Sequence, residues 1–239
     1  MALAGCGTTT VLSSRFRSDL PLPAPSPAPD SLRAGMLFGS VAVQGQPSKL
    51  DDFREGSTGG HPVADWSTSP WRVSGQAQLT TGETFRILGG FAWGGTQSMW
   101  LGGLKRWTLP DAILELEVLG GATYGSAYTT YSESCDPNLC TTDTLRDTTD
   151  TPRFWSQLAI TGYARHGGLW GEFRVLPELQ VASLPSSVSL NESTIAVGTG
   201  WWHPFSDHCM ALLGGRLILT QNKAVPQAVV QFQVGTSRP

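Results

Sequence analysis

Trp71-Arg72-Val73-Ser74-Gly75-Gln76-Ala77-Gln78-Leu79 alternates apolar with small or polar residues. The same alternation recurs in Leu114-Glu115-Leu116-Glu117-Val118 and in Val230-Gln231-Phe232-Gln233-Val234. A two-residue period predicts β-strands with one apolar face and one polar face. In a soluble barrel the apolar face forms the core, whereas in a membrane barrel it faces lipid and the polar face lines the lumen. The direction of the apolar face therefore decides the class of protein.

The composition of the chain excludes several classes of protein. The 239 residues suffice for one large all-β domain or two small ones. Only 15% of them are charged, the formal net charge is -3, and no basic patch indicates a nucleic-acid partner. The sequence contains no apolar run of about 18 residues, the length that a transmembrane helix needs. A place in a membrane would therefore require a barrel or a lipid anchor.

Turn residues divide the chain into about ten strands, with eight to ten as the expected range. Long joints at 46–69 and 132–152 alternate with tight ones such as Thr81-Gly82-Glu83. If both chain ends lie on one side, the long joints fall on the other, which is typical of outer-membrane barrels. We therefore expect an antiparallel up-and-down transmembrane β-barrel. Its strands are predicted at approximately 34–45, 70–80, 84–95, 98–107, 111–131, 153–165, 168–183, 192–203, 207–220 and 225–235.

Tryptophans lie near the ends of these predicted strands. Amphipathic rings at both ends of an apolar band are typical of a membrane interface, so we expect them to form two aromatic girdles. In a soluble sandwich, several would instead occupy the middle of a strand in the core. The set comprises Trp71, Trp93, Trp107, Trp155, Trp170, Trp201 and Trp202.

The polar faces of the strands carry both signs of charge. Such a set is too highly charged for the core of a soluble barrel, although a soluble sandwich could place it outside. Inside a small membrane barrel, arginines and glutamates can pair across strands, and side chains largely fill the lumen. We therefore predict a lumen plugged by Arg/Glu pairs. The charged set comprises Arg72, Arg86, Glu115, Glu117, Glu172, Arg174 and Arg216, together with Glu178.

The first 33 residues differ from the rest of the chain. Leu3-Ala4-Gly5-Cys6 resembles the lipobox of bacterial lipoproteins, and this resemblance implies a lipid on Cys6. Residues 21–29, Pro-Leu-Pro-Ala-Pro-Ser-Pro-Ala-Pro, are typical of a polyproline spacer that forms no core. We therefore expect residues 1–33 to be a disordered tether and residues 34–239 to be the barrel domain.

Two of the four cysteines lie close together in a polar joint. Cys135 and Cys140 bracket the turn residues Asp136-Pro137-Asn138-Leu139, so a disulfide is expected there in an oxidising compartment. The alternative is a pair of unpaired surface thiols. Cys209 lies in a strand, where we interpret it as a small apolar residue.

The segment from Val197 to Leu217 resembles the penultimate hairpin of small OmpA/OmpW-like outer-membrane barrels. It reads Val197-Gly198-Thr199-Gly200-Trp201-Trp202-His203-Pro204-Phe205-Ser206-Asp207-His208, and the next strand ends Leu213-Gly214-Gly215-Arg216-Leu217. The departure is the C-terminus, Val234-Gly235-Thr236-Ser237-Arg238-Pro239, because such barrels usually end on an aromatic residue. The resemblance implies a bacterial outer membrane with lipid and lipopolysaccharide around the barrel, and no chemistry.

No catalytic or metal site emerges from the sequence. His203, Ser206, Asp207 and His208 could be imagined as a Ser/His/Asp set, but they are contiguous and are interpreted as a polar turn. The leading hypothesis is a structural or scaffolding barrel without a cofactor other than the Cys6 lipid, contacting envelope proteins through 46–69 and 132–152. The alternatives are a soluble or surface-anchored lipoprotein that binds a ligand, and a barrel lipid hydrolase.

Overall fold

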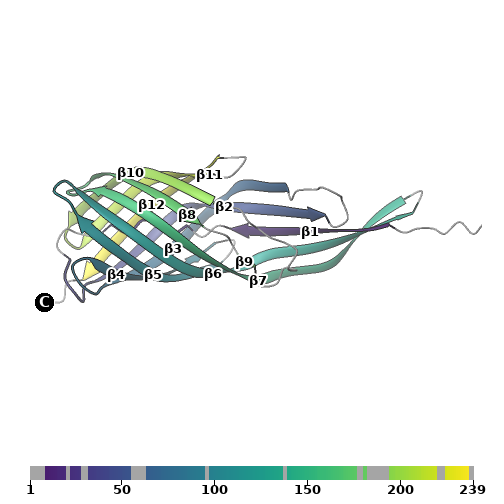
Figure 1. The fold of residues 1–239 in the computed structure, drawn as a ribbon, viewed down its shortest axis with the longest axis horizontal. Coiled ribbons are helices and arrows are strands. Elements are labelled where there is room, and N and C mark those ends of the chain that lie inside the picture. Colours follow the sequence, from purple (N-terminus) through teal and green to yellow (C-terminus); the bar gives the residue numbers. More distant parts are fainter. Residues whose placement is uncertain are drawn as a thin grey trace, which may run out of the picture.

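The fold is a closed antiparallel β-barrel from one end of which several β-strands extend beyond the ring (Figure 1). The computed structural model describes residues 9–19, 22–27, 32–54, 63–94, 97–136, 139–176, 180–181, 194–219 and 224–236. None of these residues forms a helix that is long and apolar enough to cross a bilayer. The strands are β1 (Thr9–Asp19), β2 (Leu37–Arg54), β3 (Val63–Thr80), β4 (Phe85–Trp93), β5 (Gln97–Thr108), β6 (Ala112–Asp136), β7 (Leu139–Ala164), β8 (Gly168–Leu176), β9 (Gln180–Val181), β10 (Thr194–Ser206), β11 (Cys209–Leu219) and β12 (Ala224–Thr236).

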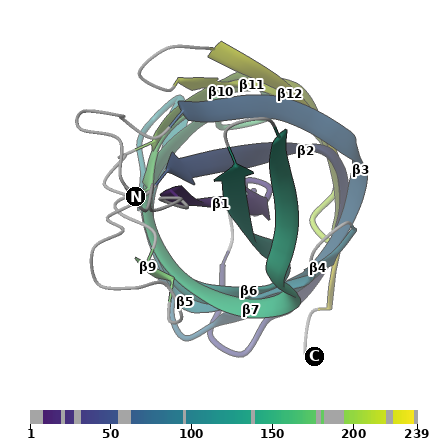
Figure 2. The same ribbon diagram turned by 90° about the vertical axis from the view of Figure 1, so that its right-hand side faces the viewer.

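Ten strands form the ring, and every neighbouring pair in it is antiparallel (Figure 2). The order is β2-β3-β4-β5-β6-β7-β8-β10-β11-β12, and the pairing of β12 with β2 closes it. The sequence prediction of about ten antiparallel strands is therefore confirmed. The pairing is consecutive because short turns join neighbouring strands, as expected for an up-and-down barrel.

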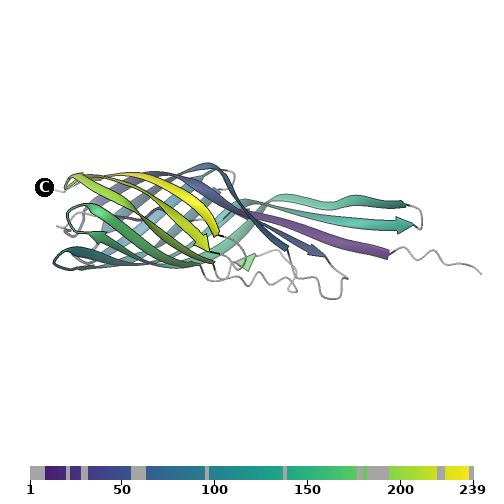
Figure 3. The same cartoon turned by 90° about the horizontal axis from the view of Figure 1, so that it is seen from above.

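Short turns gather at one end of the barrel, here called the turn end. They are residues 81–84, 109–111, 165–167 and 207–208, and the start of β2 and the end of β12 lie at the same end. At the opposite end, called the projecting end, β2, β3, β6 and β7 run past the ring (Figure 3). The predicted long joints were therefore assigned too widely: strands reach Arg54 and Asp136 and restart at Val63 and Leu139.

The described wall places its apolar face outside. In β12 the residues alternate strictly between exposed and buried, with Val230, Phe232 and Val234 exposed and Gln231 and Gln233 buried. The same arrangement holds around the ring, where large exposed apolar side chains include Leu101 at 66% and Leu213 at 60%. A soluble barrel requires the opposite arrangement, because its apolar face forms the core.

Four of the predicted girdle tryptophans face outward. Trp71 and Trp93 lie toward the projecting end, and Trp107 and Trp201 lie toward the turn end. The prediction was wrong for Trp155, Trp170 and Trp202, which are at most 5% exposed and point inward. Trp201 and Trp202 illustrate the reason, because successive residues of a strand point to opposite faces.

Candidate functional site: the barrel lumen

The N-terminal segment Leu22–Pro27 lies inside the barrel, where all six residues are buried. Leu22 is 0% exposed and belongs to an apolar cluster with Leu88, Trp100 and Ile218 of the wall. Ala24 belongs to a second apolar cluster with Trp170 and Trp202. Within residues 1–33, which the sequence predicts as a tether, Leu22–Pro27 therefore lies between polar and apolar side chains of the wall.

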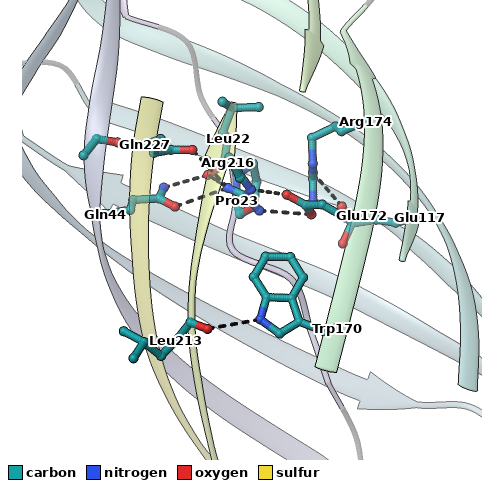
Figure 4. Close-up of polar contacts among 11 residues, drawn as sticks. Leu22, Pro23, Gln44, Glu117, Trp170, Glu172, Arg174, Leu213, Arg216 and Gln227 are labelled. Atoms are coloured by element: carbon teal, nitrogen blue, oxygen red, sulfur yellow. Dashed lines mark hydrogen bonds and ion pairs between the residues drawn. The ribbon is translucent and has the colours of Figure 1, made fainter. Parts of the chain in front are cut away.

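The wall binds this segment through its backbone carbonyls. Gln44 Nε2 donates to the carbonyl of Leu22 over 2.6 Å, and Arg216 donates to the carbonyls of Leu22 and Pro23 over 3.2 and 2.6 Å (Figure 4). Further toward the turn end, Arg86 donates to the Ser26 carbonyl over 2.9 Å. The segment therefore runs along the lumen from the projecting end toward the turn end.

Two glutamine side chains hold the part of the segment nearer the turn end. Gln76 donates to Ser26 Oγ, and Gln233 Nε2 donates to the Pro27 carbonyl over 2.8 Å. Prolines at every second position lack a backbone N–H, so the segment presents many acceptors and few donors. Arginine and glutamine side chains supply the donors that such a chain needs. This complementarity gives the polar face of the wall a specific partner.

The larger charge cluster lies beside Leu22 and Pro23 (Figure 4). Arg174 donates to Glu117 over 2.8 Å and to Glu172 over 3.3 Å, and Arg216 makes a bidentate contact with Glu172. All four side chains are at most 4% exposed. A buried carboxylate between two guanidinium groups satisfies its lone pairs, which offsets the cost of desolvation.

A second cluster lies beside Ser26. Arg86 donates to Glu115, to Gln78 and to the Ser26 carbonyl, so one guanidinium joins three strands and the threaded segment. Arg72 is buried in the lumen wall and has an interaction partner of its own. Glu178 lies outside the described residues.

Sequence reasoning missed Arg106. This side chain is 1% exposed, points into the lumen and is the register partner of Glu115. The alternation contained the information, because Arg106 lies between the outward residues Lys105 and Trp107.

Glycines shape the space for these side chains. Gly198 lies between β8 and β11, and a Cβ there would approach Glu172 Cγ to 2.9 Å and Arg216 Cγ to 3.0 Å. Gly200 and Gly214 are register partners, and a Cβ on either would meet the Trp170 ring within 2.7 Å. The ring also donates its Nε1 hydrogen to the Leu213 carbonyl over 3.3 Å (Figure 4). Bare backbone therefore lets large rings and charged groups share the lumen with the segment.

The chain leaves the lumen at the turn end. Leu32, Met36 and Phe38 form a small apolar cluster there, and Thr80 Oγ1 donates to the carbonyls of Arg33 and Met36. Gly35 adopts a φ of 85°, a left-handed conformation that favours glycine, and donates its N–H to the Thr80 carbonyl. This turn feeds the chain directly into β2.

At the projecting end, β1 continues the threaded chain outside the ring. It pairs with the end of β2 over Ser13–Asp19 and with β6 over Thr9–Arg17, both antiparallel. β1 therefore bridges two strands that are separated in the ring by β3, β4 and β5. The backbone pairing fixes the N-terminal chain at this end of the barrel.

The remaining predicted sites have different outcomes. Cys6 lies outside the described residues, and Cys135 and Cys140 are register partners at the tip of the β6–β7 hairpin. Cys209 is a free, half-buried cysteine. In the polar turn, His203 contacts the Phe205 ring edge-on, and Ser206 Oγ accepts from the His208 N–H. These are local contacts of a hairpin, in which no Ser/His/Asp relay is formed among the described side chains.

Comparison with known proteins gives likeness only at the level of the barrel. No family model matches the sequence, and no curated protein matches it either. Among solved structures, the outer membrane protein Omp33 of Acinetobacter baumannii has a TM-score of 0.34 and 7% identity, covering 85% of this chain and 98% of that one. The translocator domain of the autotransporter NalP from Neisseria meningitidis has a TM-score of 0.33 and 10% identity, covering 99% and 91%.

Proposed function

We propose that this chain is a bacterial outer-membrane β-barrel that threads its own N-terminal segment through the lumen and serves as a scaffold outside the cell. The observation that carries the proposal is the reversal of faces: among the described residues, a closed ring exposes Leu, Val, Phe and Trp and buries five arginines and three glutamates. A surface of this kind is unstable in water and matches the hydrocarbon layer of a bilayer. We further propose that the segment Leu22–Pro27 and the Arg/Glu pairs close the lumen to solutes.

The two rims of the apolar band support a position across a membrane. At the turn end, Lys105 Nζ lies 5.4 Å from the centre of the Trp107 ring, a pair suited to lipid headgroups. At the projecting end, an apolar hollow of about 370 Å³ is lined by residues that include Phe91, Trp93, Met99 and Tyr124. We propose acyl chains of membrane lipid or lipopolysaccharide as its occupants.

The placement of short turns and long strands at opposite ends of the barrel supports the scaffolding role. Short turns of such barrels face the periplasm and longer connections face outward. On this assignment β1 and the projecting parts of β2, β3, β6 and β7 lie outside the cell. They include residues 46–54, 63–69, 132–136 and 139–152, for which we propose contacts with other envelope proteins.

Epitope insertion in intact cells tests this topology. One tag is placed between Pro137 and Asn138 at the hairpin tip, and a matched tag is placed after Gly82 in a short turn. We expect antibodies to bind the first tag in intact cells and the second only after permeabilisation. Binding to both, or the reverse order, would contradict the proposed orientation. A chain that stays monomeric and soluble without detergent would contradict the membrane location itself.

A disulfide between Cys135 and Cys140 is a separate proposal. Directly opposed residues of antiparallel strands have Cα atoms about 4.5–5.5 Å apart, within the range that a disulfide spans. We expect the purified protein to lose two hydrogens in mass relative to its reduced form. An unchanged mass after reduction would show that the two residues remain thiols.

The lipid proposed on Cys6 competes with the pairing of β1. Thr9 is the register partner of Cys135, which lies eleven residues beyond Tyr124 on β6, or about 36 Å along the strand. Three residues from Thr9 to Cys6 reach only about 10 Å. A lipid at Cys6 would thus lie far from the outward aromatic residues unless β1 separates from its neighbours. Mass spectrometry of the N-terminus from native membranes decides whether Cys6 is acylated.

A further inference from the structure

The wall of the barrel is hydrogen-bonded all the way round without the threaded segment. Each ring strand pairs with two ring neighbours, and the contacts from the wall to Leu22–Pro27 come from side chains. The segment itself has no strand pairing over these six residues. Its departure would therefore remove no ladder hydrogen bond from the ring. Because β1 lies at the projecting end and β2 starts at the turn end, β1 would have to separate from β2 and β6 for the segment to leave the lumen.

The wall beneath the segment carries an excess of positive charge. The described lumen side chains include Arg72, Arg86, Arg106, Arg174 and Arg216 against Glu115, Glu117 and Glu172. Carbonyl oxygens of Leu22, Pro23 and Ser26 accept hydrogen bonds from Arg216 and Arg86. The segment therefore places the partial negative charges of its carbonyl groups beside two of these arginines. Small anions offer the same acceptors together with a full charge.

We propose that the segment Leu22–Pro27 is a displaceable plug over an anion-selective conduit. With the segment in place, carbonyls occupy Arg86 and Arg216 and the lumen is closed. With the segment out, water and small anions such as chloride take up these donors, and an excess of two arginines over glutamates in the described wall favours anions over cations. This inference rests on the proposed membrane location and adds a transport activity to it.

Planar-bilayer recording of the refolded full chain and two variants tests the plug. One variant lacks residues 1–33, and the other is the full chain carrying Leu22→Lys and Ser26→Lys, which places like charge beside Arg216 and Arg86. Arg33→Lys, at an exposed position outside the lumen, is the matched control. We expect stepwise conductance from both variants and none from the full chain or the control. A synthetic peptide of residues 20–33 should block the truncated barrel.

The reversal potential in a potassium chloride gradient tests the selectivity. We expect the sign of an anion-preferring pore in both variants. Adding Arg86→Gln and Arg216→Gln to the truncated chain leaves three arginines and three glutamates in the described wall, and the reversal potential should shift toward zero. A cation-preferring reversal potential would overturn the assignment of anions.

Three outcomes would overturn the plug. The first is a full chain that conducts as strongly as the variants, and the second is a folded, heat-modifiable variant barrel that never conducts. The third is failure of both variants to fold, which would show that the segment is an integral part of the barrel. These recordings use refolded protein and are independent of the epitope test, so the conduit and the scaffold orientation can fail separately.

Discussion

The two faces of the same ten strands obey different constraints. In the proposed membrane location, outward residues such as Leu101, Leu213 and Phe232 meet a uniform hydrocarbon and need only be apolar. Inward residues meet defined partners: Glu172 is held by Arg174 and Arg216, and Gly198 is required by the space that they fill. The outer face therefore constrains only the residue type, whereas the inner face also constrains the size and position of each side chain.

The largest loss of stability is expected from the inner face. Glu172→Leu removes the carboxylate that both Arg174 and Arg216 contact and leaves two buried guanidinium groups without it. Breaking a buried pair of this kind costs about 3–5 kcal/mol in the free energy of unfolding. Urea unfolding in lipid vesicles measures the change, with Glu83→Leu on an exposed turn as the control. A loss no greater than that of the control would show that water already screens this cluster.

The outer face should respond to charge according to depth. Leu101→Arg places a charge in the middle of the apolar band of β5 and should cost about 2–4 kcal/mol. Lys105→Arg, four residues along the same face, keeps a charge at the rim and should cost about 0–1 kcal/mol. The same unfolding experiment compares the two. Equal costs at both positions would mean that the band does not lie across a bilayer as proposed.

The strands and their faces could be predicted from the sequence because a two-residue period is a local property. Arg86, Glu115, Glu172 and Arg216 follow from alternation, and the structure brings them into ion pairs. The alternation also assigns Trp202 to the lumen once Trp201 faces out, although a rule based on strand ends placed both in a girdle.

The threading could not be predicted in the same way. A proline-rich run is typical of a solvated spacer, and its burial depends on partners such as Arg216, which lies 194 residues from Leu22. One local feature is consistent with it: residues 20–29 are uncharged between Asp19 and Asp30. Such a run is compatible with a lumen that supplies donors to its carbonyls.

The glycines of the inner face should be more sensitive than those of the outer face. Gly200→Val adds a side chain where a Cβ already lies 2.7 Å from Trp170 Nε1 and 2.2 Å from the Leu213 carbonyl. We expect a loss of about 1–3 kcal/mol, because the ring must move. Gly162→Val is the control, since nothing lies within 4 Å of a Cβ there. The Trp170 environment can be followed by fluorescence, and equal stability of both variants would contradict close packing at Gly200.

The smallest effect is expected at the rim of the outer face. Lys105→Met keeps the length of the side chain and removes the charge that lies over Trp107. A partly exposed cation–π contact contributes about 0.5–1 kcal/mol, so the unfolding free energy should fall by no more than that. Trp107→Leu on the same rim, alone and combined with Lys105→Met, completes a double-mutant cycle that isolates the pair. Additive losses in this cycle would mean that each residue contacts the bilayer independently of the other. The rim would then require only suitable residue types, as proposed for the centre of the outer face.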